Sequence, residues 1–228
     1  PAFSFDGVDD YVEIPHSSTL DISTGHTVDL WVKVDAYPLS GQASFLVNKW
    51  VNGAEDKELL ILSTGKVQFY LFNSFGFIPL YSNAVLALGT WYHIAATYDG
   101  TTAEIYTNGV LDASKAASGD VSDGGGKLYF GHNPERSGFS PFKGQIDEIE
   151  WYNRALTAQE IQAVFNAGSA GKCKPCPLLP TNDYCVPLLS QPSTCTNGGP
   201  NEYCLPSSIQ WDPVTGVEEG LLENARAG

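Results

Sequence analysis

The chain has 228 residues, of which 43% are hydrophobic and 12% aromatic, so it is long enough for one large domain and too apolar for general disorder. Twelve Lys and Arg residues stand against 26 Asp and Glu residues, and the net charge of −14 argues against nucleic acid as a partner, because basic groups bind phosphates. No stretch approaches the roughly 18 to 20 consecutive apolar residues of a membrane helix, so we expect no membrane span.

The start of the chain and its cysteines indicate where the protein works. Pro1 opens the sequence and Met is absent, so we expect a processed or excised piece of a longer product. All five cysteines lie between Cys173 and Cys204, and this clustering favours an oxidising compartment over the cytosol. We therefore expect a secreted protein, extracellular or at the cell surface.

From Ala2 to Tyr152 short apolar runs alternate with turns, as in an antiparallel β-sandwich. In residues 27–34 every second residue is Val or Leu, which places one apolar set on the core face of a strand. Turn residues at 63–65, 99–100 and 108–109 predict hairpins between neighbouring strands. The other runs with strand character are 43–49, 59–62, 66–72, 91–98, 103–106, 127–130 and 145–152.

One short amphipathic helix is predicted after the last of these strands. Thr157 and Glu160 form a capping box ahead of an apolar set that starts at Ile161, and Gly168 supplies a stop. For residues 1–168 we therefore expect an all-β domain, a two-sheet antiparallel sandwich with one short C-terminal helix.

The composition changes at about Ser169, where strand patterning stops and Pro, Cys, Ser, Thr and Asn take over. The sequence NDYCVP at 182–187 returns 19 residues later as NEYCLP at 201–206. Loops of this size are too short to bury a core of their own. We expect residues 169–228 to form a Cys/Pro-rich irregular tail with little regular structure.

The cysteines of the tail leave more than one interpretation open. Cys173 and Cys176 form a CxxC, but no second CxxC and no histidine pair follows to complete a zinc site, so disulfides are favoured. Because five is an odd number, at least one thiol stays free, pairs with another part of the protein or links two chains in self-association. No pairing is chosen among the disulfide candidates Cys173, Cys176, Cys185, Cys195 and Cys204.

An acidic turn lies near the start of the chain. Residues 6–10 pack three carboxylates around one glycine, an oxygen-rich arrangement that calcium accepts. Asp147 lies on an otherwise hydrophobic strand, where an unpaired carboxylate is costly to bury. A cation shared between the turn and Asp147 would bind the oxygens of the turn and would also give the buried Asp147 a partner. The alternative is a solvated acidic turn, with Asp147 held by backbone donors.

Three segments of the chain have a characteristic order and spacing: FDGVDDYVEI at 5–14, WYHIAATYDG at 91–100 with IYTNG at 105–109, and GQIDEIEWYNRALT at 144–157. Together they resemble the laminin G-like jelly-roll family of the concanavalin A-like lectin/glucanase superfamily. The resemblance covers residues 2–168 and does not reach the tail. It implies a jelly-roll sandwich with a structural Ca²⁺ held by side-chain and main-chain oxygens. The ligands that it implies are Asp6, Gly7, Asp9, Asp10 and Asp147.

Glu148 and Glu150 raise the question of hydrolysis. They are two residues apart on a strand, with Cα atoms roughly 7 Å apart, and so resemble the acid and nucleophile of a glycosidase. Related jelly-roll glucanases carry three acidic residues on one strand face, whereas here Ile146 occupies the third position and Asp147 points the other way. This departure argues against hydrolysis, and we expect a solvent-facing pair and no enzyme.

Aromatic and polar residues on the predicted loops are the candidates for ligand contact, because lectin-like modules stack aromatic rings on sugars and direct polar groups at them. Packing is the alternative for each one. The four histidines lack metal-ligand spacing and are expected to be structural. The candidate ligand residues are Asn48, Trp50, Asn73, Phe75, Phe77, His132, Asn133 and Arg136.

These patterns predict an extracellular, calcium-stabilised module that binds a glycan or an extracellular protein. Two alternatives stay open. The odd cysteine and the tail fit a structural subunit of a surface assembly, filament or adhesin. The pair Glu148 and Glu150 fits a divergent glycoside hydrolase.

Overall fold

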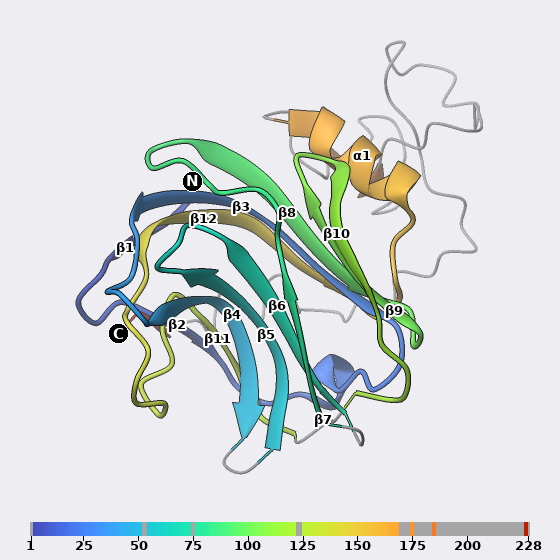
Figure 1. Cartoon of the computed structure of the whole chain (residues 1–228), viewed down its shortest axis with the longest axis horizontal. Coiled ribbons are helices and arrows are strands. Elements are labelled where there is room, and N and C mark those ends of the chain that lie inside the picture. Colours follow the sequence, from blue (N-terminus) through green and yellow to red (C-terminus); the bar gives the residue numbers. More distant parts are fainter. Residues whose placement is uncertain are drawn as a thin grey trace.

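The computed structural model of the chain describes residues 2–51, 54–73, 76–121 and 125–168, together with three two-residue strands that come later in the sequence. Its strands form two curved sheets that lie face to face as a sandwich (Figure 1). All the pairings between these strands are antiparallel.

The elements fall into two main sheets, a separate strand pair and two helical segments. The first sheet has the spatial order β1 (Phe3–Asp6), β12 (Lys143–Tyr152), β3 (His26–Ala36), β8 (Trp91–Tyr98), β9 (Thr102–Thr107) and β10 (Val110–Ala116). The second sheet has the order β15 (Arg226–Ala227), β2 (Val12–Ile14), β11 (Lys127–Phe130), β4 (Ala43–Val51), β5 (Ala54–Leu62), β6 (Val67–Asn73) and β7 (Gly76–Tyr81). The remaining elements are the 3₁₀ helix η1 (Ser18–Leu20), the helix α1 (Ala158–Ala167), and the pair β13 (Lys174–Pro175) and β14 (Tyr184–Cys185).

Strands from the two ends of the domain sequence are neighbours in space. β1 pairs with β12, with Phe3 opposite Ile146, whereas β2 pairs with β11, with Val12 opposite Phe130. Consecutive strands at the start of the chain therefore belong to different sheets, as in a jelly roll. The predicted fold class, a two-sheet antiparallel sandwich with one short helix, is confirmed.

The hydrophobic core fills the space between the two sheets. In β3 the predicted alternation holds, and Val28, Leu30 and Val32 are buried toward the second sheet. Leu59 and Ile61 of β5 approach from the opposite side and belong to the same apolar cluster. Burial of one face of each strand therefore fixes the register, because a slip by one residue would expose these side chains to water.

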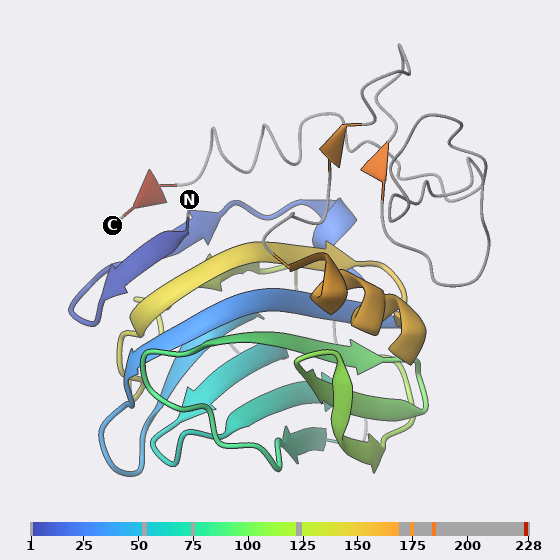
Figure 2. The ribbon, with the colours of Figure 1, turned by 90° about the horizontal axis from the view of Figure 1, so that it is seen from above.

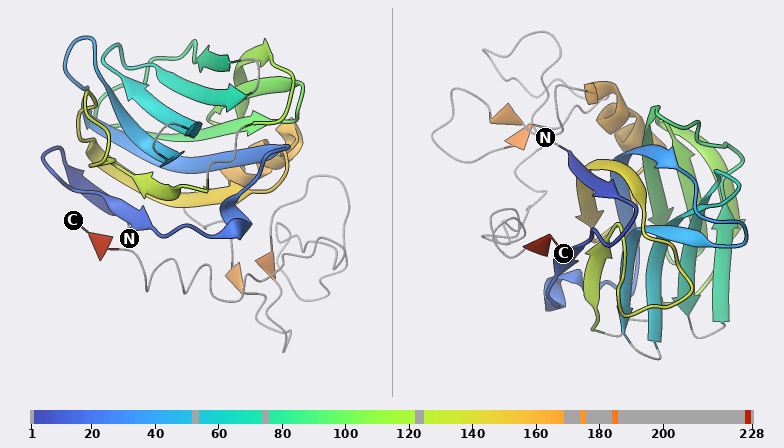
Figure 3. Two further views of the ribbon diagram at one scale, coloured as in Figure 1. Left: turned by 90° about the horizontal axis from the view of Figure 1, so that it is seen from below. Right: turned by 90° about the vertical axis from the view of Figure 1, so that its left-hand side faces the viewer.

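The helix α1 covers the outer face of the first sheet. Its N-cap Thr157 and Glu160 exchange side-chain and backbone hydrogen bonds, so the predicted capping box is confirmed. Burial raises the pKa of the Glu160 carboxyl, but hydrogen bonds from Arg154 and Thr157 outweigh burial and lower it. Ile161 belongs to the same apolar cluster as Ala95 of β8. The helix lies on the side of the first sheet away from the core (Figures 2 and 3).

His26 is an aromatic member of the core. Its ring stacks on Trp151, with ring centroids 6.1 Å apart, and contacts Phe69 and Tyr98 at similar distances. Burial, and then the positive charge of Lys57, lower the pKa of His26 to about 3, against a smaller opposing effect of the Thr24 carbonyl. The folded domain therefore holds this imidazole neutral, as expected for a structural histidine.

This burial predicts a specific acid sensitivity. The unfolded chain binds a proton at His26 near pH 6.5 and the folded chain only near pH 3, so stability is complete above pH 6.5 and falls as the pH drops toward 3. Between about pH 5.5 and 4 the expected slope from this group approaches about 1.4 kcal/mol per pH unit. NMR titration of the His26 ring protons should show no proton uptake in this window. Titration of His26 with an ordinary midpoint would contradict the assignment.

Candidate functional site

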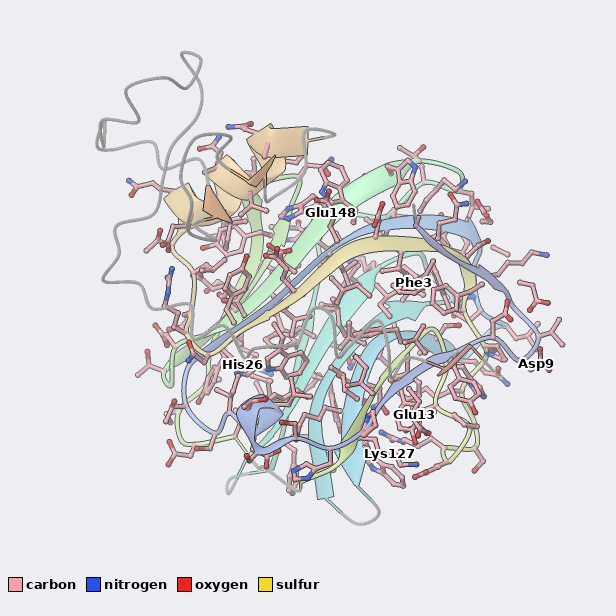
Figure 4. The ribbon with its side chains drawn as sticks, turned by 180° about the vertical axis from the view of Figure 1, so that it is seen from behind. Phe3, Asp9, Glu13, His26, Lys127 and Glu148 are labelled. Carbon is pink, nitrogen blue, oxygen red and sulfur yellow. The ribbon has the colours of Figure 1, made fainter. Side chains whose placement is uncertain are left out.

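The acidic turn links the two sheets. β1 ends at Asp6 in the first sheet and β2 begins at Val12 in the second, so the residues between them cross the edge of the sandwich. Gly7 has a φ of +83°, and a Cβ at this position would lie 2.9 Å from the Cβ of Lys143 on β12, so glycine is required there. Asp9 marks the tip of the turn in Figure 4.

Three carboxylates of this turn converge. One oxygen each from Asp6, Asp9 and Asp10 lies within 4.8 Å of the others, and the three side chains are largely exposed. The Val8 amide donates to Asp6 Oδ1 at 2.7 Å, and the Asp6 amide donates to Asp10 Oδ2 at 2.8 Å. Carboxylate oxygens with a flexible, glycine-containing backbone are what calcium accepts, so the residues of the turn fit that ion.

Asp147 lies away from the turn, and here the shared-ion hypothesis needs correction. Lys143 is the partner of Asp6 across the β1–β12 ladder, and Asp147 comes four residues later on the same strand. At about 3.3 Å per residue, roughly 13 Å of strand separates it from the turn. In Figure 4 Glu148, the next residue, likewise lies far from Asp9. The Glu148 amide donates to Asp147 Oδ1 at 2.9 Å, so a backbone donor holds this carboxylate.

The pair Glu148 and Glu150 lies in a distorted part of β12. The register shifts between Asp147 and Glu150, and Glu148 has a φ of +49°, so strict alternation fails at this bulge. Glu150 accepts a hydrogen bond from the hydroxyl of Tyr152. Tyr152 packs with Ile161 of α1, so this side of the strand faces the helix rather than open solvent. This placement does not favour an acid and nucleophile pair that faces a substrate.

Four of the predicted ligand residues come together on the outer face of the second sheet. Asn48 of β4 and Glu58 of β5 are opposite one another, and Asn48 Nδ2 donates to Glu58 Oε1 at 2.9 Å. Asn133 Nδ2 donates to Asn48 Oδ1 at 2.6 Å. Arg136 donates to the same Glu58 oxygen, and its guanidinium lies over the ring of Trp50 at 5.3 Å. These contacts fasten the loop between β11 and β12, yellow in Figure 1, to the sheet.

The network is a packed structure and not an open pocket. Asn48 and Asn133 are fully buried, and their amides bind each other and Glu58. The Arg136 guanidinium lies 4.8 Å from the ring centroid of Phe139 and 5.4 Å from that of Phe45. The two asparagines are therefore packed inside the protein, where they support the loop.

His132, Asn73 and Phe75 stay outside this network. Burial lowers the pKa of His132, the residue before Asn133. The side chain of Asn73 and the whole of Phe75 lie outside the described residues. The five cysteine candidates also lie outside them, apart from the backbone of Cys185 in β14, and the disulfide hypothesis stays a prediction.

Beside the network, β6 and β7 carry a strip of aromatic side chains. Phe77 lies opposite Phe72 across the strands, with ring centroids 4.8 Å apart, and stacks on Tyr70 at 5.2 Å. Tyr81 lies opposite Gln68 on the same pair of strands. Phe77 is 54% exposed and Tyr81 is 48% exposed. We call Tyr70, Phe72, Phe77 and Tyr81 the aromatic strip.

Sequence reasoning found Phe77 but missed most of its neighbours. Tyr70 and Phe72 alternate with the buried Phe69 and Leu71 in β6, so the period of two already placed them on the outer face. No sequence pattern indicated that Glu58 belongs to the buried network, because its role depends on an ion pair with Arg136, which is 78 residues away in the sequence.

Within the described residues, the acidic turn is the group in which three or more metal-binding side chains lie close together. The described part of the chain also contains no helix with the length and apolar character needed to cross a membrane.

Comparison with known proteins gives a family and a set of similar folds. A family model described as the concanavalin A-like lectin/glucanases superfamily matches residues 6–162. No curated protein matches the chain. A heptameric SAP-like pentraxin from Limulus polyphemus is similar in structure, with a TM-score of 0.56 and 17% identity over 72% of this chain and 81% of the pentraxin chain.

Two further structures are similar over the same part of the chain. A putative carbohydrate binding protein from Bacteroides ovatus has a TM-score of 0.57 and 21% identity over 71% of this chain and 45% of its own. Domain 4 of AbnA, an extracellular arabinanase from Geobacillus stearothermophilus in complex with arabinotriose, has a TM-score of 0.55 and 22% identity over 71% of this chain and 74% of its own. At these identities the likeness concerns the fold alone.

Removal of the Arg136 guanidinium should destabilise the domain strongly. The substitution Arg136→Ala leaves Glu58 as a buried carboxylate without its cation, and we expect a loss of about 3 kcal/mol in the free energy of unfolding. Lys33→Ala is the matched control, because its ion pair with Asp35 is longer and more exposed, and it should cost less than about 1 kcal/mol. Urea unfolding measures both. Equal losses in the two variants would contradict the structural role of Arg136.

Proposed function

The chain belongs to the concanavalin A-like lectin/glucanase superfamily, and we propose that it is an extracellular, calcium-stabilised binding module that recognises a glycan on the outer face of its second sheet. The observation that carries the proposal is the aromatic strip, in which Phe77 and Tyr81 are exposed and Tyr70 and Phe72 are half-buried beside them. An exposed apolar cluster of this kind is costly to leave in water and marks an interaction surface.

The chemistry of the strip suits sugars. An aromatic ring offers a flat apolar face to the C–H groups of a pyranose or furanose, and a polar group at its edge bonds a hydroxyl. Phe77 supplies the exposed face, and the amide of Gln68 and the hydroxyl of Tyr81 supply both donors and acceptors. Two of the similar structures are described as carbohydrate-binding or as bound to arabinotriose, which supports the same class of ligand.

We propose binding without catalysis. The candidate acid pair, Glu148 and Glu150, lies on the first sheet, at a bulge and on the side where α1 packs. The aromatic strip lies on the second sheet, so a glycan held there stays away from both carboxylates. A hydrolase would need its acid and its nucleophile on either side of the bound glycosidic bond.

Calcium at the acidic turn would act on stability and not on recognition. Asp6, Asp9 and Asp10 would supply carboxylate oxygens, and the ion would offset the repulsion among their three negative charges at close range. Because the turn joins the two sheets, an ion there would also fasten their edges together.

Calcium should raise the thermal stability of the protein through the turn and not through Asp147. A ligand that binds only the folded state stabilises it by mass action, so we expect chelation to lower Tm and added calcium to restore it. Asp9→Asn should abolish this response, whereas the matched variant Asp147→Asn should keep it. Differential scanning fluorimetry measures both. A calcium response lost in Asp147→Asn and kept in Asp9→Asn would contradict this assignment.

Glycan binding should depend on the aromatic strip. We expect Phe77→Ala to weaken binding to any polysaccharide that the protein retains in affinity gel electrophoresis, by about 10-fold or more. Trp91→Ala is the matched control, because Trp91 is a partly exposed aromatic residue on the first sheet. Equal effects of the two variants would place the site elsewhere. If no polysaccharide is retained and Phe77→Ala abolishes capture of a protein partner, the strip is a protein interface instead.

A further inference from the structure

We propose that Lys49 and Asp21 join in an intramolecular amide bond, formed by the protein itself, that ties β4 to the segment in front of β3. This modification site is separate from the aromatic strip and does not depend on the proposed glycan binding. Three observations carry the inference: two lysines are buried side by side, Lys49 contacts Asp21, and a histidine contacts the second oxygen of the same carboxylate.

Two lysines lie side by side inside the sandwich. Lys49 of β4 is directly opposite Lys57 of β5, and both side chains are buried. They point to the inner side of the second sheet, because Asn48 and Glu58, their neighbours in the chain, bind each other on its outer face. Like charges directly opposite one another are destabilising, and the interior screens them poorly. Removal of the charge from one of these amines would lower that cost.

Lys49 is in contact with a carboxyl group that its amine can attack. The Nζ atom of Lys49 lies 3.0 Å from Asp21 Oδ1, so the nitrogen is held next to the carboxyl carbon. Asp21 directly follows the 3₁₀ helix η1, between the buried side chains of Leu20 and Ile22. A contact fixed by the fold replaces a chance encounter of the two groups. Burial also penalises the charged form of an amine, and the neutral amine is the nucleophile.

A histidine at the second oxygen of Asp21 completes the arrangement. His16 Nε2 lies 2.8 Å from Asp21 Oδ2, and the His16 side chain is 43% exposed, so its ring can exchange protons with water. The Asp21 side chain is 24% exposed, which gives the water released by the reaction a route to solvent. Lys49 and His16 therefore contact opposite oxygens of one carboxyl group, as a nucleophile and a proton carrier must.

The proposed step is a condensation that needs no other reactant. A proton first passes from the Lys49 ammonium to the Asp21 carboxylate, which gives the amine and the acid. Nζ then attacks Cγ of Asp21, the bond from Cγ to Oδ2 breaks, and Oδ1 remains as the amide oxygen. His16 takes up the proton that the nitrogen loses and delivers it to Oδ2, which departs as water. One cation and one anion disappear from the interior, and nothing is oxidised or reduced.

The bond would give the domain a covalent link that cysteines cannot supply there. All five cysteines come after residue 168. Lys49 belongs to the second sheet and Asp21 precedes β3 of the first sheet, so the link would join segments that lead into different sheets. Like a disulfide, it would close a loop between residues 28 apart in the sequence and so restrict the unfolded chain.

Mass spectrometry of the full chain under denaturing conditions tests the proposal. We expect a mass about 18 Da below that calculated from the sequence, because one water is lost. Trypsin should then release residues 1–33 joined to residues 34–57, because an acylated Lys49 is not cleaved. Dehydration at an Asp–Gly pair also removes one water but joins no peptides. A chain of full mass, or a loss of water without the joined fragment, would overturn the proposal.

Variants assign the reacting groups. Lys49→Arg keeps a cation beside Asp21 but offers no amine, and Asp21→Ala removes the carboxyl group, so both variants should show their full mass. Lys33→Arg is the matched control, because it alters a more exposed ion pair with Asp35, and it should keep the joined fragment. His16→Ala should leave part of the chains without the link. A joined fragment that persists in Lys49→Arg would overturn the assignment of the amine, and complete linkage in His16→Ala would overturn the role of His16.

Discussion

The first two strands hold the two sheets of this protein in place. β1 completes the first sheet against β12, and β2 completes the second sheet against β11, although only the acidic turn separates β1 from β2 in the sequence. Pairing strands that are more than 100 residues apart carries a large entropic cost, which burial of the inner faces offsets. The turn also brings three carboxylates together at the edge where the sheets meet. Their mutual repulsion opposes the pairing of β1 with β12 and of β2 with β11. A divalent ion at the turn would therefore act where closure of the sandwich is weakest.

The arrangement of the layers limits where a ligand can bind. The inner faces of both sheets form the core, and α1 packs on the outer face of the first sheet. The loop after β11 packs on one part of the outer face of the second sheet through Arg136 and Glu58. Phe77 and Tyr81 of β7 remain exposed beside it. The buried polar network thus has a structural task, which is to hold the loop and its aromatic residues against the sheet, and the binding that we propose is assigned to the strip.

Patterns local in the sequence predicted much of the fold. Alternation in β3 located its buried face, and the capping box at Thr157 located the start of α1, because both depend on residues within one element. The carboxylates of the acidic turn were predictable for the same reason, since they are neighbours in the chain.

Features that depend on pairing between distant strands were not predictable. The register of β1 against β12 puts Asp147 far from the acidic turn, and no local pattern fixes that register. The bulge at Glu148 breaks the alternation of side chains along β12. It likewise depends on how β12 pairs with β3, which no local pattern indicates. Asn48 and Asn133 were separate candidates for ligand contact, and their mutual contact and burial against Glu58 became apparent only once β4 and β5 were paired. The measurement that tests the account most directly is an NMR titration of the labelled protein with oligosaccharides. The account predicts that the largest chemical-shift changes fall on residues 68–72 and 77–81; changes confined to the first sheet around α1 would contradict it.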